Sequence, residues 1–510
     1  MMWGWTRKGR GYYKYDNASH GSPHGLNHEL FWKCRQDFAD KYGATWVGEG
    51  QDAPAGEALR EQFAANLNVA LDVLRRDEAT VSYLADRLVE LGDSVPEDVK
   101  GFRLPVSANP LRDDALWDFE KYPDNMWAEP GAKQPNRAAL ARWGSWVNAT
   151  CREKHGRPLF LACSADLAGS TNIAGFAADY DDLSNYGWYE RETAPEGVLL
   201  PQEITEFQNA SLCVGAASVN MAEDPESEFN GFYTACSTYG SFSYLKYGAM
   251  RLYSQMAQDC EHKLGKVIWI AGHSGPETAE DSRTHFGIFS PGITQMFPDG
   301  HVIDIHPWEY NEVPVMLAAA MKTDRPIVAL HLTRPGVLIP DRKALGLASH
   351  FEAAKGAYVL RDYKAGLPRQ GCVFVQGTMS TYNLIRALDD IDAAGVNVKI
   401  VAVPSPQLFK LQDRDYRDTV ITDADRMNST YITNRARRLM SDWDFNPLAG
   451  DYAVCSDHDD MWREGGALDE VCEDAGIDPE NIVKAVVGFA QDYEKRMDLL
   501  QRMVGDAAKV

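Results

Sequence analysis

Apolar positions along this chain recur with a period that changes from one region to the next. Between Gly56 and Leu91, apolar residues recur at helical spacing in EALREQFAANLNVALDVLRR and again in VSYLADRLVEL, which predicts a helical segment. Residues 94–135 are rich in Pro, Asp and Asn, which predicts a linker. After residue 135, short apolar runs alternate with helical stretches of about ten to fifteen residues, a pattern typical of βαβ units and parallel sheets.

This alternation divides the rest of the chain into two blocks. In the first block, residues 136–345, the predicted strands include PLFLACSAD, KVIWIAGH, HVIDIHP and PIVALHLTR. In the second block, residues 346–510, they include GCVFVQG and NVKIVAVPS, and a helix over ENIVKAVVGFAQDYEKRMDLLQRMV follows. The predicted fold class is therefore α/β, with two doubly wound, mainly parallel-sheet domains after a helical and linker segment over residues 1–135.

Composition narrows the classes of partner. The formal net charge is −23 and the sequence pI is about 5.0, which disfavours binding to nucleic acid or to anionic membranes. We find neither a secretory signal nor an apolar run long enough to span a bilayer. The nine cysteines are scattered and form no CxxC pair, so we expect reduced thiols, no zinc site built on them and a cytoplasmic location.

Three polar loops directly follow predicted strands of the first block. They read CSADLAGSTN, GHSGPETAEDSRTH and LTRPG. In open α/β sheets, ligands bind beyond the carboxyl ends of the strands, where such loops come together. Although a single polar loop is usually just a loop, three on one sheet edge predict a functional site there.

These loops carry a resemblance to transketolases, the thiamine-diphosphate enzymes that move two-carbon ketol units between sugar phosphates. SADLAGSTN resembles the SADL-x-x-SN segment of the family's pyrimidine-binding domain, and GHSGPETAEDSRTH keeps the His-to-His spacing of the family's loop ending Glu-Asp-Gly-Pro-Thr-His. HLTRPG resembles the family's Ser-Arg strand end, and VQGTMSTYNLIRALDDIDAAGVNVKIVAVPSPQLFKLQ its C-terminal domain. The resemblance covers about residues 142–483. A weaker one, in TRKGRGYYKYDNASHGSPHG, is to the end of the diphosphate-binding domain.

The resemblance implies a set of cofactor-binding residues. Glu206 matches the glutamate that hydrogen-bonds the pyrimidine nitrogen of thiamine diphosphate, and Phe242 matches the aromatic residue that stacks on that ring. Another alignment puts Tyr239 in the stacking position, and both remain open. Asp166 matches a residue near the cofactor at the subunit boundary, although an Asp there also suits a helix N-cap. His20 matches a histidine near the diphosphate and the substrate.

The resemblance also implies substrate contacts. A dianionic phosphate needs charge-assisted donors, and two arginines, a hydroxyl and an imidazole supply them. His273 would also exchange a proton with the reacting carbonyl, because imidazole titrates near neutral pH. Catalytic roles are implied for Glu206, His273, His285 and His20. The implied sugar-phosphate contacts are Arg142, Ser170, His273 and Arg334, and the sugar-hydroxyl contacts are Asp281 and His285.

One part of the family's machinery has no counterpart here. The family binds Mg²⁺ and the cofactor diphosphate through a GDG motif and a later Asn, and this sequence contains no GDG. We therefore expect no metal ligands in this chain. The resemblance then implies a split enzyme, in which a separate N-terminal transketolase subunit carries the diphosphate and Mg²⁺ site. We expect two copies of each chain in a heterotetramer, acting in the pentose phosphate pathway.

Two other functions stay open at this stage. The first is a thiamine-dependent component of a 2-oxoacid dehydrogenase, which has no sugar phosphate to hold. Arg142 and Arg334 discriminate here, because the sugar-phosphate hypothesis fails if they point away from the site. The second is a non-catalytic, transketolase-like subunit, against which Glu206, His273, Asp281 and His285 argue. The sequence names neither the donor nor the acceptor sugar.

Overall fold

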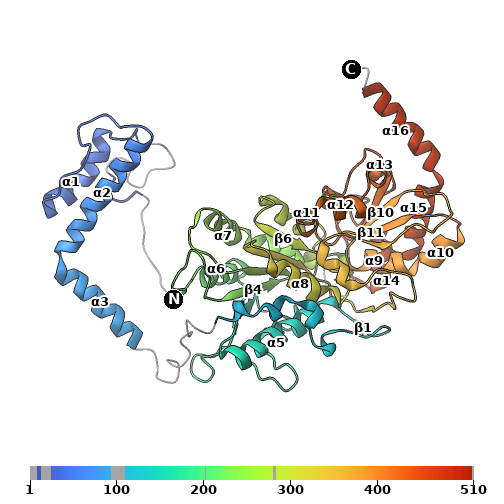
Figure 1. Ribbon diagram of the computed structural model, residues 1–510, viewed down its shortest axis with the longest axis horizontal. Coiled ribbons are helices and arrows are strands. Elements are labelled where there is room, and N and C mark those ends of the chain that lie inside the picture. Colours follow the sequence, from blue (N-terminus) through green and yellow to red (C-terminus); the bar gives the residue numbers. More distant parts are fainter. Residues whose placement is uncertain (1–8, 13–23, 94–108, 202, 279–282, 508–510) are drawn as a thin grey trace. The chain divides into compact units, whose positions relative to one another are not determined.

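The structure is a computed structural model that describes residues 9–12, 24–93, 109–201, 203–278 and 283–507 (Figure 1). His20 and Asp281, two of the implied site residues, lie outside these ranges. The chain forms two compact units, Met1–Gly101 and Phe102–Val510. Within the described ranges, every helix is too short or too polar to cross a membrane. The nine cysteines are all free thiols.

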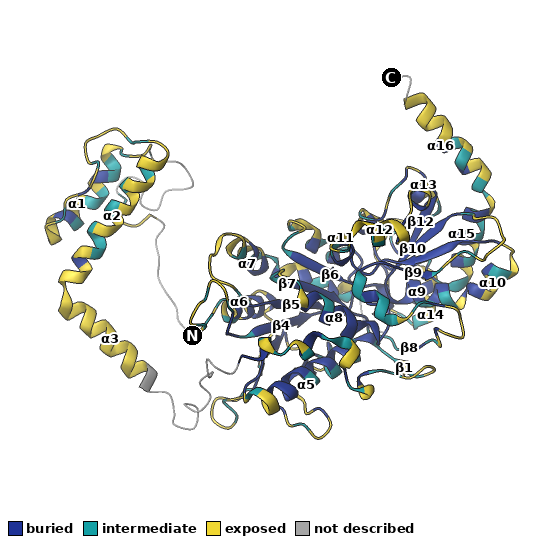
Figure 2. Ribbon diagram, in the orientation of Figure 1, coloured by how far each residue is buried: buried dark blue, intermediate teal, exposed yellow. Residues whose placement is uncertain are grey.

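The described residues of the first unit form helices α1 (Glu29–Tyr42), α2 (Glu57–Arg76) and α3 (Glu78–Asp93). The helical pattern between Gly56 and Leu91 is interrupted at Asp77, which ends α2. A small core forms around Trp32, Ala39 and Trp46 and reaches α2 through Val69. In contrast, the side chains of α3 from Glu78 to Leu91 are exposed (Figure 2).

The second unit begins with a segment that packs onto the α/β body. This segment makes up much of the region that its Pro, Asp and Asn content predicts to be a linker. Leu116 and Met126 are fully buried in the main core, because short turns fold the segment onto the α/β body. Its elements are 3-10 turns at Pro110–Arg112, Asp114–Trp117, Phe119–Lys121 and Asp124–Met126 and strand β1 (Lys133–Gln134), which pairs antiparallel with β8 (Val337–Leu338).

A six-stranded sheet carries the first α/β domain, in the order β3-β2-β4-β5-β7-β6, with every neighbouring pair parallel. Such a sheet is covered on both faces, so its strands are apolar runs. Its strands are β2 (Phe160–Ser164), β3 (Leu199–Leu200), β4 (Tyr233–Thr238), β5 (Val267–Ala271), β6 (Val302–Ile305) and β7 (Ile327–His331).

Alternation along β5 shows how the two faces are filled. Ile268 and Ile270 point into the core that contains α5 (Asn136–His155) and α8 (Glu312–Lys322). Val267 and Trp269 point into the opposite core, with α6 (Glu206–Ala217) and α7 (Tyr247–Asp259). Successive side chains of a strand face opposite sides, so one strand supplies both cores.

A five-stranded sheet carries the second α/β domain, in the order β13-β12-β10-β11-β9, with β9 antiparallel at one edge. Its strands are β9 (Tyr358–Arg361), β10 (Cys372–Gln376), β11 (Lys399–Ala402), β12 (Ser429–Thr433) and β13 (Val454–Cys455). Its helices are α9 (Thr378–Arg386), α10 (Leu388–Ala393), α11 (Pro406–Lys410), α12 (Arg414–Val420), α13 (Asp423–Met427), α14 (Leu468–Asp474), α15 (Pro479–Gln491) and α16 (Tyr493–Ala507). The predicted α/β class with mainly parallel sheets is confirmed.

Candidate functional site

The candidate site lies at the carboxyl edge of the six-stranded sheet, where parallel strands end side by side. The rings of Tyr239, directly after β4, and His273, two residues after β5, stack with centroids 3.8 Å apart and an interplanar angle of 19°. Ser170, from the loop after β2, lies 2.9 Å from the Tyr239 hydroxyl through its Oγ. Three predicted residues from three strand ends therefore meet.

His285 closes one side of this cluster. It belongs to the 3-10 turn Arg283–His285 and meets the Tyr239 ring edge-on at 5.1 Å and the Phe242 ring at 5.5 Å. Both candidate stacking residues thus contact the same imidazole. The contacts favour neither as the ring that would stack on a pyrimidine, so Phe242 and Tyr239 both remain predictions.

A glycine makes the approach of the two loops possible. A Cβ atom built at Gly240 would lie 2.1 Å from the carbonyl oxygen of His273 and 3.0 Å from the Cα of Gly287. Any side chain at Gly240 would push the loop after β4 away from the loop after β5. Gly240 therefore holds Tyr239 close enough to stack on His273.

Arg137, in the first turn of α5, contributes a cation that the sequence did not suggest. Its Nη1 donates to the carbonyl oxygen of Ser170 and lies 3.4 Å from Nε2 of His273. Burial lowers the pKa of Arg137, and the positive charge of Arg334 lowers it further. Two guanidinium charges thus act on each other beside the imidazole.

Arg142 is not part of this cluster, which corrects one predicted phosphate contact. Its Nη2 pairs with Asp181 at 3.0 Å, and its guanidinium lies 3.8 Å from the Tyr180 ring centroid. Five residues along an α-helix correspond to a rotation of about 140°, so Arg137 and Arg142 lie on different faces of α5. The position that faces the site on this helix is Arg137.

Asn136 holds the two site arginines in register. Its Oδ1 accepts a hydrogen bond of 2.9 Å from the amide of Thr333, the residue before Arg334. Its Nδ2 donates to the carbonyl oxygen of Pro307 at 3.0 Å and to Oγ1 of Thr378 at 3.1 Å. Since Asn136 directly precedes Arg137, one buried amide fixes both chain segments that carry the cations.

His273 is fully buried. Burial, followed by the charges of Arg137 and Arg334, lowers the pKa of His273 to about 3. The imidazole is therefore neutral at physiological pH, which corrects the expectation that His273 titrates near neutral pH. One ring nitrogen carries a proton and the other is a hydrogen-bond acceptor.

Glu206 begins α6 and is 7% exposed. Its Oε1 accepts a hydrogen bond of 3.0 Å from Oγ1 of Thr238, the last residue of β4. This bond places the carboxylate at the same sheet edge as Tyr239. Asp166, in the loop that carries Ser170, has an exposed side chain and a left-handed backbone with φ +58°, so it is not a helix N-cap.

Lys246 lies buried between the strand ends. Its Nζ donates to the carbonyl oxygens of Cys236 in β4 and Ile270 in β5, at 2.9 and 3.0 Å. The ammonium group therefore ties the two strands together, and its charge acts on Glu206 nearby. Sequence analysis did not single out this residue.

Glu277 is a further residue that sequence analysis did not single out, and it ties the His273 loop to the second α/β domain. Its Oε1 accepts hydrogen bonds from the Asn434 side chain and, at 3.3 Å, from the amide of Met379 at the N-terminus of α9. It is fully buried, and burial raises its pKa to about 7. The loop GHSGPET thus carries the buried His273 at one end and an interdomain contact at the other.

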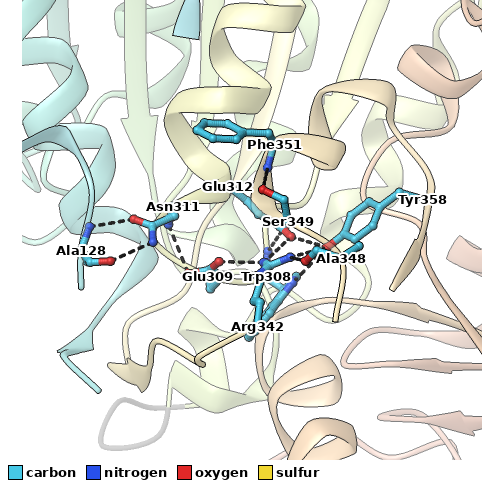
Figure 3. Close-up of polar contacts among 10 residues, drawn as sticks. All are labelled: Ala128, Trp308, Glu309, Asn311, Glu312, Arg342, Ala348, Ser349, Phe351 and Tyr358. Carbon is cyan, nitrogen blue, oxygen red and sulfur yellow. Dashed lines mark hydrogen bonds and ion pairs between the residues drawn. The ribbon is translucent and has the colours of Figure 1, made fainter. Parts of the chain in front are cut away.

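A second buried polar cluster surrounds Arg342 (Figure 3). Its Nη2 lies 2.7 Å from Glu309 and 2.9 Å from Glu312, and its Nη1 donates to the Tyr358 hydroxyl at 3.2 Å. Here the guanidinium is compensated by carboxylates within the chain. A cavity of about 510 Å³ adjoins this cluster and is lined in part by Arg342, Glu309, Trp127, His350 and Phe351.

The sequence of this chain is similar to those of known transketolases. Transketolase 1 of Pasteurella multocida is 25% identical over 402 residues, 75% of this chain and 52% of that protein. Transketolase of Geobacillus stearothermophilus is 31% identical over 160 residues, 31% of this chain and 23% of that protein. No protein-family model matches.

Solved transketolases share the fold. The structure from Leishmania mexicana superposes with a TM-score of 0.61 and 16% identity, covering 94% of this chain and 60% of that one. The structure from Campylobacter jejuni gives a TM-score of 0.56 and 17% identity, with 95% and 62% covered. The sequence matches and the superpositions together show a transketolase-like pair of α/β domains.

More narrowly, the chain is related to transketolases and resembles their C-terminal part, as its motifs predict. It spans about half the length of the curated relatives that it matches over most of its own length.

Proposed function

We propose that this chain is a transketolase-type subunit that transfers a two-carbon ketol unit between sugar phosphates with thiamine diphosphate. The observation that carries the proposal is the cation cluster at the sheet edge. Arg137 lies against Ser170 and His273 and feels the charge of Arg334. A phosphate dianion placed among these groups would relieve the repulsion between the guanidiniums and accept several charge-assisted hydrogen bonds.

This cluster favours a sugar phosphate over a 2-oxoacid as substrate. A 2-oxoacid has one carboxylate and no phosphate. It therefore offers fewer acceptor oxygens to the two guanidiniums, the hydroxyl and the imidazole. In the proposed phosphate site, Arg137 replaces Arg142 as the partner of Ser170, His273 and Arg334.

The pyrimidine half of thiamine diphosphate fits the residues near Glu206. That ring needs a buried carboxylate for its nitrogen and an aromatic face, and Glu206 lies at the same sheet edge as Tyr239 and Phe242. The cofactor, when bound, supplies the carbon nucleophile and the electron sink for cleaving a carbon–carbon bond.

The protein's own residues would act on the substrate's protons and charges. His273 is neutral, so one ring nitrogen can accept a hydrogen bond from a substrate hydroxyl and the other can donate one. His285 and Asp281 would hold sugar hydroxyls, Asp166 would contact the cofactor near a subunit boundary, and His20 would lie near the diphosphate. Gly240 and Asn136 act indirectly, because they set the positions of His273 and the two arginines.

The diphosphate and Mg²⁺ would come from a separate N-terminal subunit, and the assembly would contain two copies of each chain. The coverage supports this, because the matches span about half of the relatives. The experiment is to purify the full chain and measure thiamine diphosphate binding by calorimetry and ketol transfer from a ketose phosphate. Both are measured alone and with any chain that co-purifies. Full activity of the chain alone contradicts the two-subunit proposal.

A matched pair of variants tests the catalytic assignment. In the assembled enzyme, we expect Glu206→Gln to lower kcat by about 100-fold or more, because proton-transfer catalysis contributes a factor of that size. Glu203→Gln, an exposed glutamate three residues earlier, should leave activity unchanged. A fully active Glu206→Gln enzyme would instead support a non-catalytic subunit.

A further inference from the structure

Asp304, His306 and His331 form a buried cluster at the ends of β6 and β7. Asp304 lies in β6, His306 directly follows that strand, and His331 is the last residue of β7. All three residues are more than nine-tenths buried. One donor atom from each lies within 4.8 Å of the others, and among the described residues this is the one such group that could hold a metal ion.

The closest contact within this cluster is the pairing of Asp304 with His331. Oδ1 of Asp304 and Nε2 of His331 lie 2.7 Å apart, yet both atoms are buried without a hydrogen-bond partner. Nε2 of His306 lies 3.2 Å from Oδ2 of the same carboxylate. Buried polar atoms are nearly always satisfied, so atoms that meet without hydrogen-bond geometry call for another partner. A cation bound by the lone pairs of these atoms would satisfy them.

Outer contacts orient these groups as they do in metal sites. Nδ1 of His331 lies 3.1 Å from Oγ of Ser274, which leaves Nε2 to face Asp304. Oγ1 of Thr294 donates to Oδ2 of Asp304 at 2.9 Å. Metal-binding imidazoles and carboxylates are characteristically held by such second hydrogen bonds.

A small cavity next to Asp304 and His306 leaves room for one more ligand. Its volume is about 20 Å³, and Thr294, Gln376 and Gln407 also line it. A cavity of roughly 10–15 Å³ is enough for one water molecule. Three protein ligands and a water would supply the four ligands of many first-row metal sites.

Arg435 is the charge that such an ion must compete with. It lines the same cavity, and its guanidinium is attracted by both Asp304 and Glu277. An ion bound to Asp304 would take over the compensation of that carboxylate, and Arg435 would keep Glu277 and the Gln376 side chain as partners. The competition sets the site's affinity below that of an uncontested one.

We propose that Asp304, His306 and His331 bind one divalent first-row transition ion of the zinc type. Two imidazole nitrogens and one carboxylate suit Zn²⁺, Mn²⁺ or Fe²⁺ better than Mg²⁺, which prefers oxygen ligands. The site is separate from the Mg²⁺ of the proposed diphosphate subunit and departs from the expectation that this chain holds no metal ligands. It does not rest on the proposed transferase activity.

The test uses the full chain, stripped with a chelator and loaded with Zn²⁺ or Co²⁺. We expect one metal equivalent at this site by mass spectrometry after gel filtration, and intense visible bands of low-coordinate Co²⁺. Asp304→Asn and His331→Gln should each weaken Zn²⁺ binding by about 100-fold, and Ser274→Ala by about 10-fold, because second-shell losses have effects of 10–100-fold.

Histidines elsewhere in the chain require a matched control. His24 and His28 stack with centroids 5.2 Å apart and could hold an adventitious ion. The variant His24→Gln/His28→Gln should keep the metal equivalent and the Co²⁺ bands. Their loss in that variant, or a wild-type chain without such bands, overturns the proposal, and neither result depends on whether the Asp304 variants fold. Unchanged affinity in folded Asp304→Asn overturns it as well.

Discussion

Two arginine clusters of this protein, a buried one around Arg342 and a half-buried one around Arg137, differ in their electrostatics. Around Arg342, the carboxylates of Glu309 and Glu312 lie within 2.9 Å of one guanidinium nitrogen, and the Tyr358 hydroxyl adds a hydrogen bond. Around Arg137, the neighbours are a carbonyl oxygen, a neutral imidazole and the charge of Arg334. The first cluster is compensated within the chain, and the second is not compensated by an ion pair of Arg137 with any described carboxylate.

Because of this difference, we expect the Arg342 cluster to stabilise the fold and the Arg137 cluster to bind an anion. A buried charge is strongly unfavourable unless it is paired, so folding itself requires the Arg342 cluster to keep its partners. Repulsion within the Arg137 cluster contributes nothing to folding, and it is relieved when an anion binds. Removing a cation should therefore destabilise the fold in the first cluster and weaken anion binding in the second.

The largest expected effect belongs to Arg342. Arg342→Met would leave Glu309 and Glu312 buried without their cation, and breaking a buried pair in this way costs about 3–5 kcal/mol. Denaturant unfolding monitored by circular dichroism measures the loss. Adding Glu309→Gln and Glu312→Gln to the same chain should recover most of it. A loss of less than about 1 kcal/mol in the free energy of unfolding would show that the cluster does not stabilise the fold.

Glu277 is a buried carboxylate hydrogen-bonded by amides, which contrasts with the paired Glu309 and Glu312. Burial raises its pKa from the ordinary 4.5 to about 7, so between these values the folded state binds more protons than the unfolded state. Its contribution to stability is therefore greatest below pH 4.5 and is lost as the pH rises toward 7.

Glu277→Gln should accordingly stabilise the chain by about 3 kcal/mol at pH 8 and hardly at all at pH 4. The glutamine oxygen can still accept from Asn434 and Met379, so the interdomain contact persists. Urea unfolding at the two pH values measures the effect, and Glu203→Gln, at an exposed position, is the control. An equal change at both pH values would show that the effect is not one of protonation.

Arg137 should affect binding and leave stability intact. We expect Arg137→Met to weaken the binding of inorganic phosphate to the full chain by about 10–100-fold, because charge-assisted hydrogen bonds contribute about 1.5–3 kcal/mol each. The free energy of unfolding should stay unchanged or rise, since repulsion with Arg334 disappears. Calorimetry and denaturant unfolding of the same protein give both values. A destabilised Arg137→Met chain that still binds phosphate would reverse the comparison.

Some features of the fold and of the candidate site can be predicted from the sequence alone. The parallel sheets follow from short apolar runs such as those of β5, in which alternate residues fill two cores. The cluster of Tyr239, His273 and Ser170 follows from loops at strand ends, because parallel strands end at one edge. Both inferences need only local patterns and a general rule of topology.

Other features could not be predicted, because they depend on which face of a helix is buried and on the order of the strands in the sheet. The resemblance implies Arg142 and does not indicate Arg137, because matching a motif does not fix which side of α5 faces the sheet edge. Leu116 and Met126 are core residues in a segment whose Pro and Asp content suggested a linker. The Asp304–His331 contact follows from the pairing of β6 with β7, strands whose adjacency no local pattern reveals.

The smallest expected effect is that of Arg142, which is the matched control for Arg137 on the same helix. Its ion pair with Asp181 is partly exposed, and such pairs contribute about 0–1 kcal/mol. Arg142→Met should therefore lower the free energy of unfolding by about 1 kcal/mol at most, including the contact with the Tyr180 ring. Phosphate affinity should stay unchanged, because its guanidinium lies on another face of α5. If Arg142→Met weakened phosphate binding as much as Arg137→Met, the anion would not bind where the second cluster lies.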